Sequence, residues 1–360
     1  RGRHGAAGRV RPVHQVIAAA APADAITGQA LAWREVLAGW GHRGEIVAEH
    51  VHPDLRGSVR RLDAGGEALL ADDRAVVILR YSVWSAGVDA ALAVPGRVVL
   101  WYHNITPGKL LRPWNAPLAQ DCDRARAALP RLRGRARALV ADSAFNAAEL
   151  AAAGMPGASV IPLLLEGPAD PPSPAPHPGP PLIVSVGRIV PNKRLDDVIK
   201  AFALYQRHHA PGASLALVGG HDGFESYRAA LGRLVERVGA RGVTFTGRVP
   251  EAERDAWYAR ASAYLCMSAH EGFCAPLVEA MAAGVPVVAR DAGAVRETLG
   301  GAGIVIEPDL PLAAEALHEV VSSSSTRTGL AAVAAARLRE LSPASVAERL
   351  RAALAPVLAA

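Results

Sequence analysis

The chain has 360 residues, of which 51% are hydrophobic and 20% are charged, and its net charge at neutral pH is +5. This composition is typical of a globular protein, and the length exceeds what one ordinary core supports, so we expect two domains. The three cysteines (Cys122, Cys266 and Cys274) lack CxxC spacing, which argues against a disulfide framework and against a zinc site.

Targeting and membrane-spanning patterns are not apparent in the sequence. The first dozen residues, from Arg1, are basic with no cleavage pattern after them, and no apolar run reaches the roughly eighteen residues of a spanning helix. Isolated cysteines are typical of a reducing compartment. We therefore expect a cytoplasmic protein and leave peripheral membrane contact open.

The excess of positive charge has two interpretations. It predicts a polyanionic substrate, an acidic membrane surface or nucleic acid as a partner, or it reflects arginines scattered over solvated faces. No RNA- or DNA-binding motif is present in the sequence. We therefore expect no nucleic-acid partner.

Strands and helices alternate in the first half of the chain. An apolar run at 13–21 predicts a buried strand, and the helical spacing of 24–41 ends on a glycine, a usual helix stop. Further strands are predicted at 44–51, 75–81, 97–105 and 137–143, the last followed by a helix through Leu150.

A proline-rich segment then interrupts the alternation. Residues 167–181 read GPADPPSPAPHPGPP, in which eight of fifteen residues are proline. Such a stretch favours an extended conformation and cannot pack as a helix or a central strand. We interpret it as a linker between an N-terminal domain at 1–166 and a C-terminal domain at 182–341, with a last helix at 342–360 that packs back on the first domain.

The alternation resumes after the linker, with strands predicted at 182–190, 214–220, 243–249, 263–269 and 286–291. Strands that alternate with helices predict parallel sheets with right-handed crossovers. The predicted fold class is therefore α/β, with two doubly wound, Rossmann-like domains facing a shared cleft. Ligands of such sheets bind at the carboxyl ends of the strands.

Two motifs follow strands of the second domain. In EGFCAPLVEA, a turn leads from Glu271 into a helix that carries Glu279 and has Pro276 in its first turn. The first turn of a helix attracts anions, while a carboxylate on that helix can accept hydrogen bonds from a ribose diol or a sugar. In GRIVPNKR, Arg188 and Lys193 stand five apart on a loop before a helix, which suits a diphosphate. Capping carboxylates and ordinary surface charge are the competing interpretations of the two motifs.

Together these motifs resemble the donor-site signatures of family 4 retaining glycosyltransferases, which have the GT-B fold. The resemblance is dense over about 182–310 and includes LALVGG, VTFTGRV and YLCMSAHEGF in the usual order. WYHNITP and ADSAFNAAEL in the first half look similar to one branch of the family. The likeness implies no cofactor, since a nucleotide sugar is the substrate.

The resemblance also implies residue roles. Arg188 and Lys193 would bind the nucleotide diphosphate, Glu279 the ribose, and Glu271 the donor sugar, while His103 would lie near that sugar. The remaining implied contacts come from the turn after Glu271 and from a backbone that faces the base: Gly272, Phe273, Cys274, Ala275 and Val249. The family's diglycine loop after the first strand is replaced here by APADAITGQA, in which Gly28 alone offers flexibility.

One further motif resembles a metal site. Asp121 and Asp123 have the Asp-x-Asp spacing of metal-dependent glycosyltransferases, but an arginine-rich helical run follows them. We interpret them as a helix start, where acidic residues are favourable, and expect no metal.

The predicted activity is retaining transfer of a hexose from a UDP- or GDP-sugar to a hydroxyl acceptor. Lipid-linked glycans, other sugars and small molecules stay open as acceptors. Two alternatives are a sugar-nucleotide epimerase or phosphorylase on the same scaffold and a non-catalytic sugar-nucleotide binder.

Overall fold

A computed structural model describes residues 11–359 of the chain, apart from 23, 95–96, 166, 168–171 and 173–178. Most of the linker predicted at 167–181 thus lies outside the described residues. The chain divides into two compact units, each assembled from separate stretches. Unit 1 contains Arg1–Ile105, Arg124–Leu164 and Val346–Ala360, and unit 2 contains Thr106–Asp123 and Leu165–Ser345.

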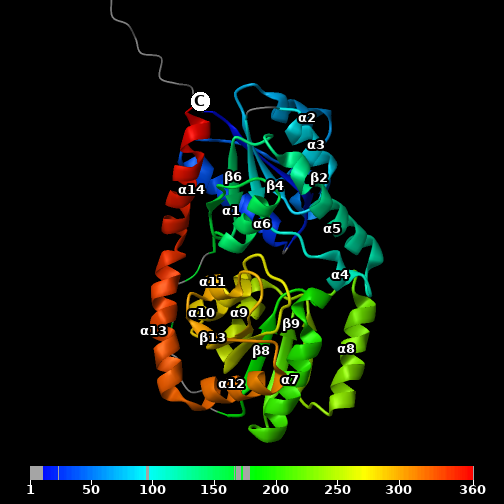
Figure 1. The fold of residues 1–360 in the computed structure, drawn as a ribbon, viewed down its shortest axis with the longest axis vertical. Helices are drawn as coiled ribbons and strands as arrows, with labels where there is room; N and C mark the ends of the chain where they lie inside the picture. Colours follow the sequence, from blue (N-terminus) through cyan, green and yellow to red (C-terminus); the bar gives the residue numbers. More distant parts are fainter. Residues whose placement is uncertain are drawn as a thin grey trace, which may run out of the picture. The chain divides into compact units, whose positions relative to one another are not determined.

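Each unit contains one parallel sheet with helices packed around it (Figure 1). The strand order is β3-β2-β1-β4-β5-β6-β7 in unit 1 and β10-β9-β8-β11-β12-β13 in unit 2, and every strand pairing within the two sheets is parallel. In each sheet the chain first adds strands outward on one side of the central strand (β1 or β8) and then on its other side, as in a doubly wound sheet. The predicted fold class of two Rossmann-like domains is confirmed.

The strands of unit 1 are β1 Val13–Ala20, β2 Ile46–Val51, β3 Arg60–Arg61, β4 Val76–Tyr81, β5 Val98–Tyr102, β6 Ala138–Ala141 and β7 Ser159–Val160. Its helices are α1 Ala25–Gly39, η1 Pro53–Leu55, α2 Ala64–Ala71, α3 Ala86–Leu92, η2 Leu129–Leu132 and α6 Ala144–Ala152. Helix α4, Gly108–Leu111, belongs to unit 2, and helix α5, Ala116–Ala128, has its residues up to Asp123 in unit 2 and the rest in unit 1.

The strands of unit 2 are β8 Leu182–Val186, β9 Ser214–Val218, β10 Val243–Gly247, β11 Ala263–Cys266, β12 Val287–Arg290 and β13 Gly303–Ile306. Its helices are η3 Pro191–Lys193, α7 Leu195–His208, α8 Glu225–Val238, α9 Glu251–Arg260, α10 Ala275–Ala282, α11 Val295–Leu299, α12 Leu310–Ser322 and α13 Ser324–Glu340. The chain ends with α14, Pro343–Leu358.

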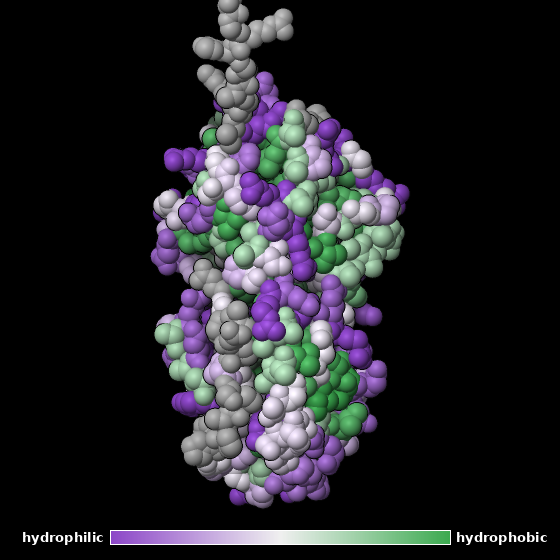
Figure 2. All heavy atoms as spheres, turned by 90° about the vertical axis from the view of Figure 1, so that its left-hand side faces the viewer, coloured by the Kyte–Doolittle hydropathy of each residue, from purple (hydrophilic) through white to green (hydrophobic). Residues whose placement is uncertain are grey.

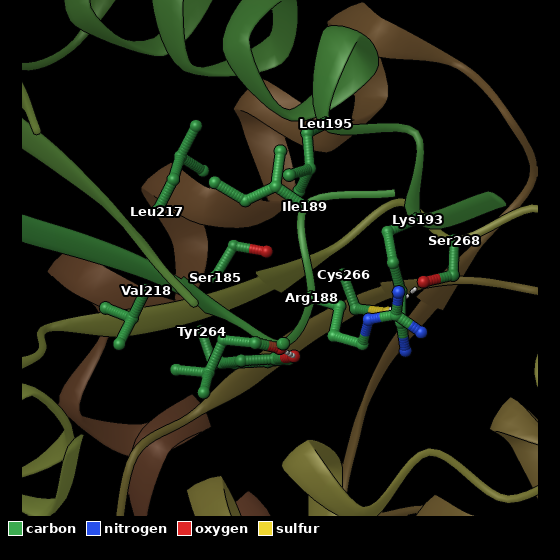
Figure 3. A pocket seen from close by; sticks show the side chains of 12 residues that line it. Ser185, Arg188, Ile189, Lys193, Leu195, Leu217, Val218, Tyr264, Cys266 and Ser268 are labelled. Atoms are coloured by element: carbon green, nitrogen blue, oxygen red, sulfur yellow. Dashed lines mark hydrogen bonds between the residues drawn. The ribbon is translucent and has the colours of Figure 1, made fainter. Parts of the chain in front are cut away.

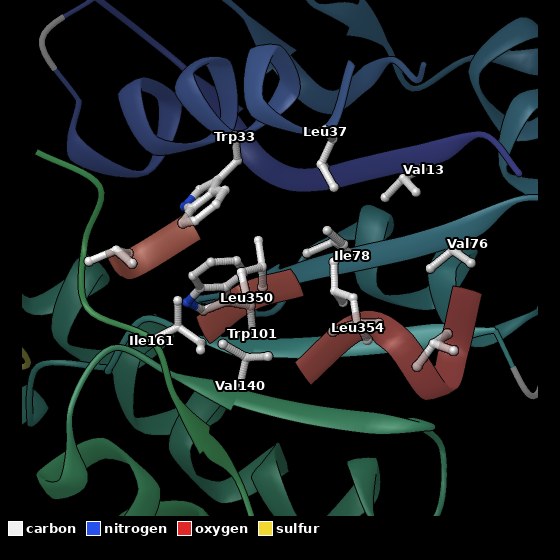
Figure 4. Packing of buried hydrophobic residues seen from close by; sticks show 13 residues of the cluster. Val13, Trp33, Leu37, Val76, Ile78, Trp101, Val140, Ile161, Leu350 and Leu354 are labelled. Atoms are coloured by element: carbon white, nitrogen blue, oxygen red, sulfur yellow. The ribbon is translucent and has the colours of Figure 1, made fainter. Parts of the chain in front are cut away.

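The C-terminal helix α14 completes the core of unit 1. Its apolar residues Val346, Leu350, Leu354 and Val357 recur at helical spacing and therefore share one face. That face packs on β1, β4, β5 and α1 in a cluster that includes Trp33 (Figure 4). The end of the chain thus belongs to the first unit, although the whole of unit 2 precedes it.

The interpretation of Asp121 and Asp123 as a helix start is wrong. Helix α5 begins at Ala116, so both residues lie in its interior. The carboxylate of Asp123 accepts a hydrogen bond from the backbone N–H of Gly108 at 3.1 Å and pairs with Arg112. Asp123 therefore anchors the start of α4.

The described surface carries few large exposed apolar side chains, namely Trp114, Leu312 and Val333. On the face drawn in Figure 2, small groups of hydrophobic residues stand among hydrophilic ones. Among the described residues, every helix is too short or too polar to cross a bilayer.

Candidate active site

The two predicted motifs meet at the centre of the sheet of unit 2. They follow β8 and β11, which are neighbours at the point where the strand order reverses. Because both strands are parallel, their carboxyl ends share one edge of the sheet. Doubly wound sheets bind ligands at this kind of edge, so the topology places the motifs where a ligand is expected.

The loop after β8 turns at Gly187, whose φ of +136° is a conformation that favours glycine. The turn ends the strand at Val186, earlier than the predicted 190. Arg188 follows, and η3 then brings Lys193 to the start of α7. Arg188 and Lys193 line one pocket together with Cys266 and Ser268 (Figure 3).

Lys193 is joined to Glu271 by an ion pair, with 2.6 Å between Lys193 Nζ and Glu271 Oε1. Both side chains are largely buried, with 21% and 8% of their surfaces exposed. Burial alone would lower the pKa of Lys193, but the attraction of Glu271 and of the two nearby cysteine sulfurs outweighs it and raises the pKa. Lys193 is therefore held as an ammonium ion.

Arg188 differs from Lys193 in its surroundings. It is exposed, and its side chain makes no hydrogen bond or ion pair with any residue that the structure describes. The pocket thus offers one uncompensated guanidinium and one ammonium that is already neutralised by a carboxylate. An anionic ligand can pair with Arg188 directly, whereas it must compete with Glu271 for Lys193.

The loop from Glu271 to Cys274 is fixed by the element that follows β12. Glu271 O accepts from Ala294 N at 3.0 Å, and Phe273 O accepts from Thr298 Oγ1 at 2.5 Å. A Cβ on Gly293 would lie 2.2 Å from Glu271 O, so only glycine permits this approach. These residues position the motif, and sequence reasoning missed them because they lie more than twenty residues away.

Helix α10 begins directly after this loop, with Cys274 as its N-cap and proline in its first turn. The first N–H groups of a helix have no partner within the helix, so this end attracts negative charge. The backbone of Gly272, Phe273, Cys274 and Ala275 thus leads into an anion-binding end, next to the strand end that carries Arg188 and Lys193.

Glu279 lies one turn into α10 and is held by α9. Its carboxylate accepts a hydrogen bond from Tyr258 Oη at 2.9 Å, and Arg254 Nη1 lies 3.5 Å away. Burial raises the pKa of Glu279, although Arg254 and the Tyr258 hydroxyl act in the opposite direction. Sequence reasoning missed both partners; their only signal is that they stand four residues apart on one face of α9.

Val249 lies two residues beyond the end of β10, at the same edge of the sheet. Its strand was predicted to run to 249, but it ends at Gly247. The backbone of Val249 is therefore in a loop and is available for contacts that a strand would already have used.

His103 belongs to unit 1 and directly follows β5. Its Nδ1 is 2.9 Å from Asp142 Oδ2, and its Nε2 is 3.0 Å from Nη1 of the buried Arg80. Both ring nitrogens therefore have protein partners. Because Arg80 can only donate, Nε2 accepts and Nδ1 carries the proton.

Gly28 also lies in unit 1, in the segment predicted as a helix at 24–41, whereas the interpretation of APADAITGQA as a flexible loop is wrong at this residue. It belongs to the first turn of helix α1 instead of a flexible loop. Asp24 caps this helix, and its carboxylate accepts from the backbone N–H of Thr27 at 2.8 Å.

Comparisons with known proteins agree with this geometry. Residues 168–336 match the model of the family described as glycosyl transferases group 1. O-antigen chain mannosyltransferase B of Escherichia coli is 33% identical over 125 residues, which are 34% of this chain and 32% of that protein. A GDP-mannose-dependent alpha-(1-6)-phosphatidylinositol monomannoside mannosyltransferase of Mycolicibacterium smegmatis is 34% identical over 137 residues, 35% of each chain. The alignments thus span about a third of these relatives.

The fold is similar over a longer stretch. Sucrose-phosphate synthase from Thermosynechococcus elongatus superposes with a TM-score of 0.77 at 17% identity, covering 97% of this chain and 99% of that one. At this identity the likeness concerns the fold alone, and it confirms the predicted GT-B architecture. Both motifs lie within the segment that matches the glycosyl transferases group 1 model.

Proposed function

We propose that the protein is a retaining glycosyltransferase that moves a hexose from a nucleotide diphosphate sugar to a hydroxyl acceptor. The observation that carries this proposal is the placement of Arg188, Lys193 and Glu271 at the switch-point edge of unit 2. The names of two relatives, both mannosyltransferases, make GDP-mannose the first donor to test, followed by UDP-sugars.

The site supports a mechanism in which the leaving diphosphate is stabilised electrostatically. Arg188 and Lys193 would bind the phosphates, with the N-terminus of α10 beside them, and preorganised charges of this kind are usually a large catalytic contribution. Glu279 would accept hydrogen bonds from the ribose hydroxyls, and backbone groups of Val249 would face the base.

The ion pair between Lys193 and Glu271 suggests how the donor is recognised. A bound diphosphate would take over part of the charge compensation of Lys193, which would leave a Glu271 oxygen available to a hydroxyl of the sugar. His103 would lie near that sugar, as the family resemblance implies, with its ring held by Asp142 and Arg80.

Catalysis in this proposal needs no metal ion, because the two cations and the helix end offset the charge of the leaving group. Retention of configuration rests on the family resemblance. A front-face route, in which the leaving phosphate accepts the proton of the acceptor hydroxyl, requires no nucleophile from the protein. A lipid-linked glycan, another sugar or a small molecule would supply that hydroxyl.

The proposal is tested by turnover of GDP-mannose and UDP-glucose with and without a panel of acceptors. We expect Arg188→Ala and Lys193→Ala each to lower turnover by about 10²–10³, as loss of a preorganised charge-stabilising donor does. Arg233→Ala removes one exposed charge from α8 of the same unit and is the matched control. Activity should survive EDTA, and the product anomer should keep the donor's configuration.

Other outcomes point to the alternatives. Donor conversion without an acceptor favours an epimerase or a hydrolase, and nucleotide binding without turnover on any acceptor favours a binding protein. Near wild-type turnover and affinity in both the Arg188 and Lys193 variants would contradict the diphosphate assignment.

A further inference from the structure

Two cysteines and a glutamate gather beside Lys193. One ligand atom each from Cys266, Glu271 and Cys274 lies within 4.8 Å of the others. In the part of the chain that the structure describes, this is the one such group of three His, Cys, Asp or Glu side chains. All three residues are buried, with at most 7% of their surfaces exposed. The spacing argument against a metal site therefore fails, because the fold brings together cysteines that stand eight positions apart.

The cluster is built by the turn between β11 and α10. Cys266 is the last residue of β11, and Cys274 caps α10 with a left-handed φ of +73°. Cys266 Sγ lies 3.4 Å from Ser268 Oγ, and both residues line the pocket that also contains Arg188 and Lys193 (Figure 3). A small ion therefore has a route to the sulfur of Cys266.

We propose that Cys266, Cys274 and Glu271 form a binding site for a thiophilic divalent cation such as Zn²⁺ or Cd²⁺. Thiolates are the preferred ligands of these ions, and a tetrahedral site with metal–sulfur bonds of about 2.3 Å has sulfurs about 3.8 Å apart. Since the ligand atoms all lie within 4.8 Å of one another, they need to contract by at most about 1 Å to reach that geometry. Ser268 Oγ or solvent supplies the fourth ligand.

The charges of the cluster suit a divalent ion. Cation binding releases two thiol protons to solvent, so that two new thiolates match the two positive charges of the ion. Glu271 and Lys193 neutralise one another in both states. The cluster as a whole therefore keeps its net charge when the ion binds.

Lys193 opposes the cation. Its ammonium group is 2.6 Å from Glu271 and supplies the positive charge that the buried carboxylate requires. Replacing Lys193 by an uncharged side chain removes this repulsion and leaves a carboxylate that needs a counter-charge, so it tightens cation binding. In the proposed function the donor sugar uses the carboxylate of Glu271, so the cation and a complete nucleotide sugar compete for this side chain, a consequence that rests on the proposed function.

The test is a titration of the full-length, EDTA-treated protein with Cd²⁺, followed by the ultraviolet charge-transfer absorption of cadmium thiolates. We expect one Cd²⁺ per chain in this site and no response to Mg²⁺, which prefers oxygen ligands. Cys266→Ser and Cys274→Gly should each weaken binding at least tenfold, and Lys193→Met should tighten it at least threefold. Glycine adopts the backbone conformation at position 274 freely, so this variant is the one expected to fold unperturbed.

Cys122→Ser is the matched control, because Cys122 is buried on α5 outside the cluster, and its cadmium affinity should equal that of the wild type. Wild-type affinity in the Cys266 and Cys274 variants, or its loss in the Cys122 variant, would overturn the proposal. Unchanged or weaker binding in Lys193→Met would also overturn it.

A second titration separates this proposal from the proposed function. Cd²⁺ should weaken the binding of an unreactive GDP- or UDP-sugar analogue in the wild type and leave it unchanged in Cys266→Ser. If neither nucleotide binds while the cadmium results hold, the proposed function fails and the cation site stands. If nucleotides bind and cadmium does not, the cation site fails alone.

Discussion

Glu271 and Glu279 belong to one motif but differ in what surrounds their carboxylates. Glu271 is paired with a buried ammonium at 2.6 Å, whereas Glu279 accepts from a neutral Tyr258 hydroxyl and has Arg254 at 3.5 Å. Glu279 therefore keeps more of its hydrogen-bonding capacity for a ligand. The same conservative substitution should have different effects at the two positions.

We expect Glu279→Gln to weaken binding of the bare nucleotide by about 1–3 kcal/mol, because an amide is a poorer acceptor for two ribose hydroxyls. Glu271→Gln should leave nucleotide affinity nearly unchanged, or raise it, since Lys193 loses its competing carboxylate. Its turnover should fall, because the contact of Glu271 is made only when the sugar is present. Calorimetry with the bare nucleotide measures the affinity, and rates with the full donor measure the turnover. Loss of nucleotide binding in Glu271→Gln but not in Glu279→Gln would reverse the two roles.

Glu271→Gln also has a cost in stability. It leaves the ammonium of Lys193 buried without its partner, and breaking such a pair costs about 3 kcal/mol. We expect a lower free energy of unfolding in denaturant titrations, and Lys193→Met in the same background should recover part of it. Full stability in Glu271→Gln would show that the pair contributes nothing to folding.

Glu279 predicts a pH dependence of stability. Burial raises the pKa of Glu279 above its ordinary value. At pH values between the ordinary and the raised pKa, the folded state therefore binds the proton more tightly than the unfolded state. Stability therefore falls as pH rises from the ordinary carboxyl pKa through the raised one. Denaturant unfolding of the nucleotide-free protein over this pH range should show the decline, and Glu279→Gln should lack that contribution. An identical pH profile in the variant would contradict the assignment.

At the scale of elements, buried strands were the easiest features to predict. β4 is buried along its whole length and reads as an apolar run interrupted only by Arg80, so its predicted bounds agree with the structure to within a residue. β3 consists of two exposed arginines, Arg60 and Arg61, and exists only because it pairs with β2. Its sequence carries no strand period, so no local pattern could have revealed it.

The site shows the same division between local and tertiary information. The motifs at Arg188–Lys193 and Glu271–Glu279 follow strands and could be recognised along the chain. Their supports come from other elements, such as Tyr258 on α9 and Thr298 on α11, and only the packed structure makes them neighbours. The proximity of Cys266 and Cys274 was hidden because it depends on the conformation of the turn between β11 and α10.

Helix α14 should act as a structural part of unit 1. Leu350 is fully buried against that core, so Leu350→Ala should lower the free energy of unfolding of unit 1 by about 2–5 kcal/mol through lost burial and the cavity left behind. Glu348→Ala on the exposed side of the helix is the matched control. Hydrogen exchange resolved by segment would measure the stability of each unit. Destabilisation of unit 2 with unit 1 unchanged would contradict the prediction.

The whole molecule consists of two units that are each discontinuous in the sequence. Segment 106–123 belongs to unit 2 although it precedes the last strands of unit 1, and the end of the chain returns to unit 1. The motifs proposed to bind the nucleotide all lie in unit 2, while His103 lies in unit 1. A nucleotide and a complete donor should therefore affect the two units differently.

Hydrogen exchange of the wild type with bare nucleotide and with an unreactive donor analogue tests this division. The nucleotide should slow exchange at 187–193 and 271–279, because a ligand bound only by the folded site lowers the population of locally open forms. The sugar-bearing analogue should extend protection to the end of β5 around His103, while β2 of unit 1 stays unchanged as an internal control. Equal protection at His103 by the nucleotide alone would contradict a sugar contact, and no added protection by the analogue would remove His103 from the donor site.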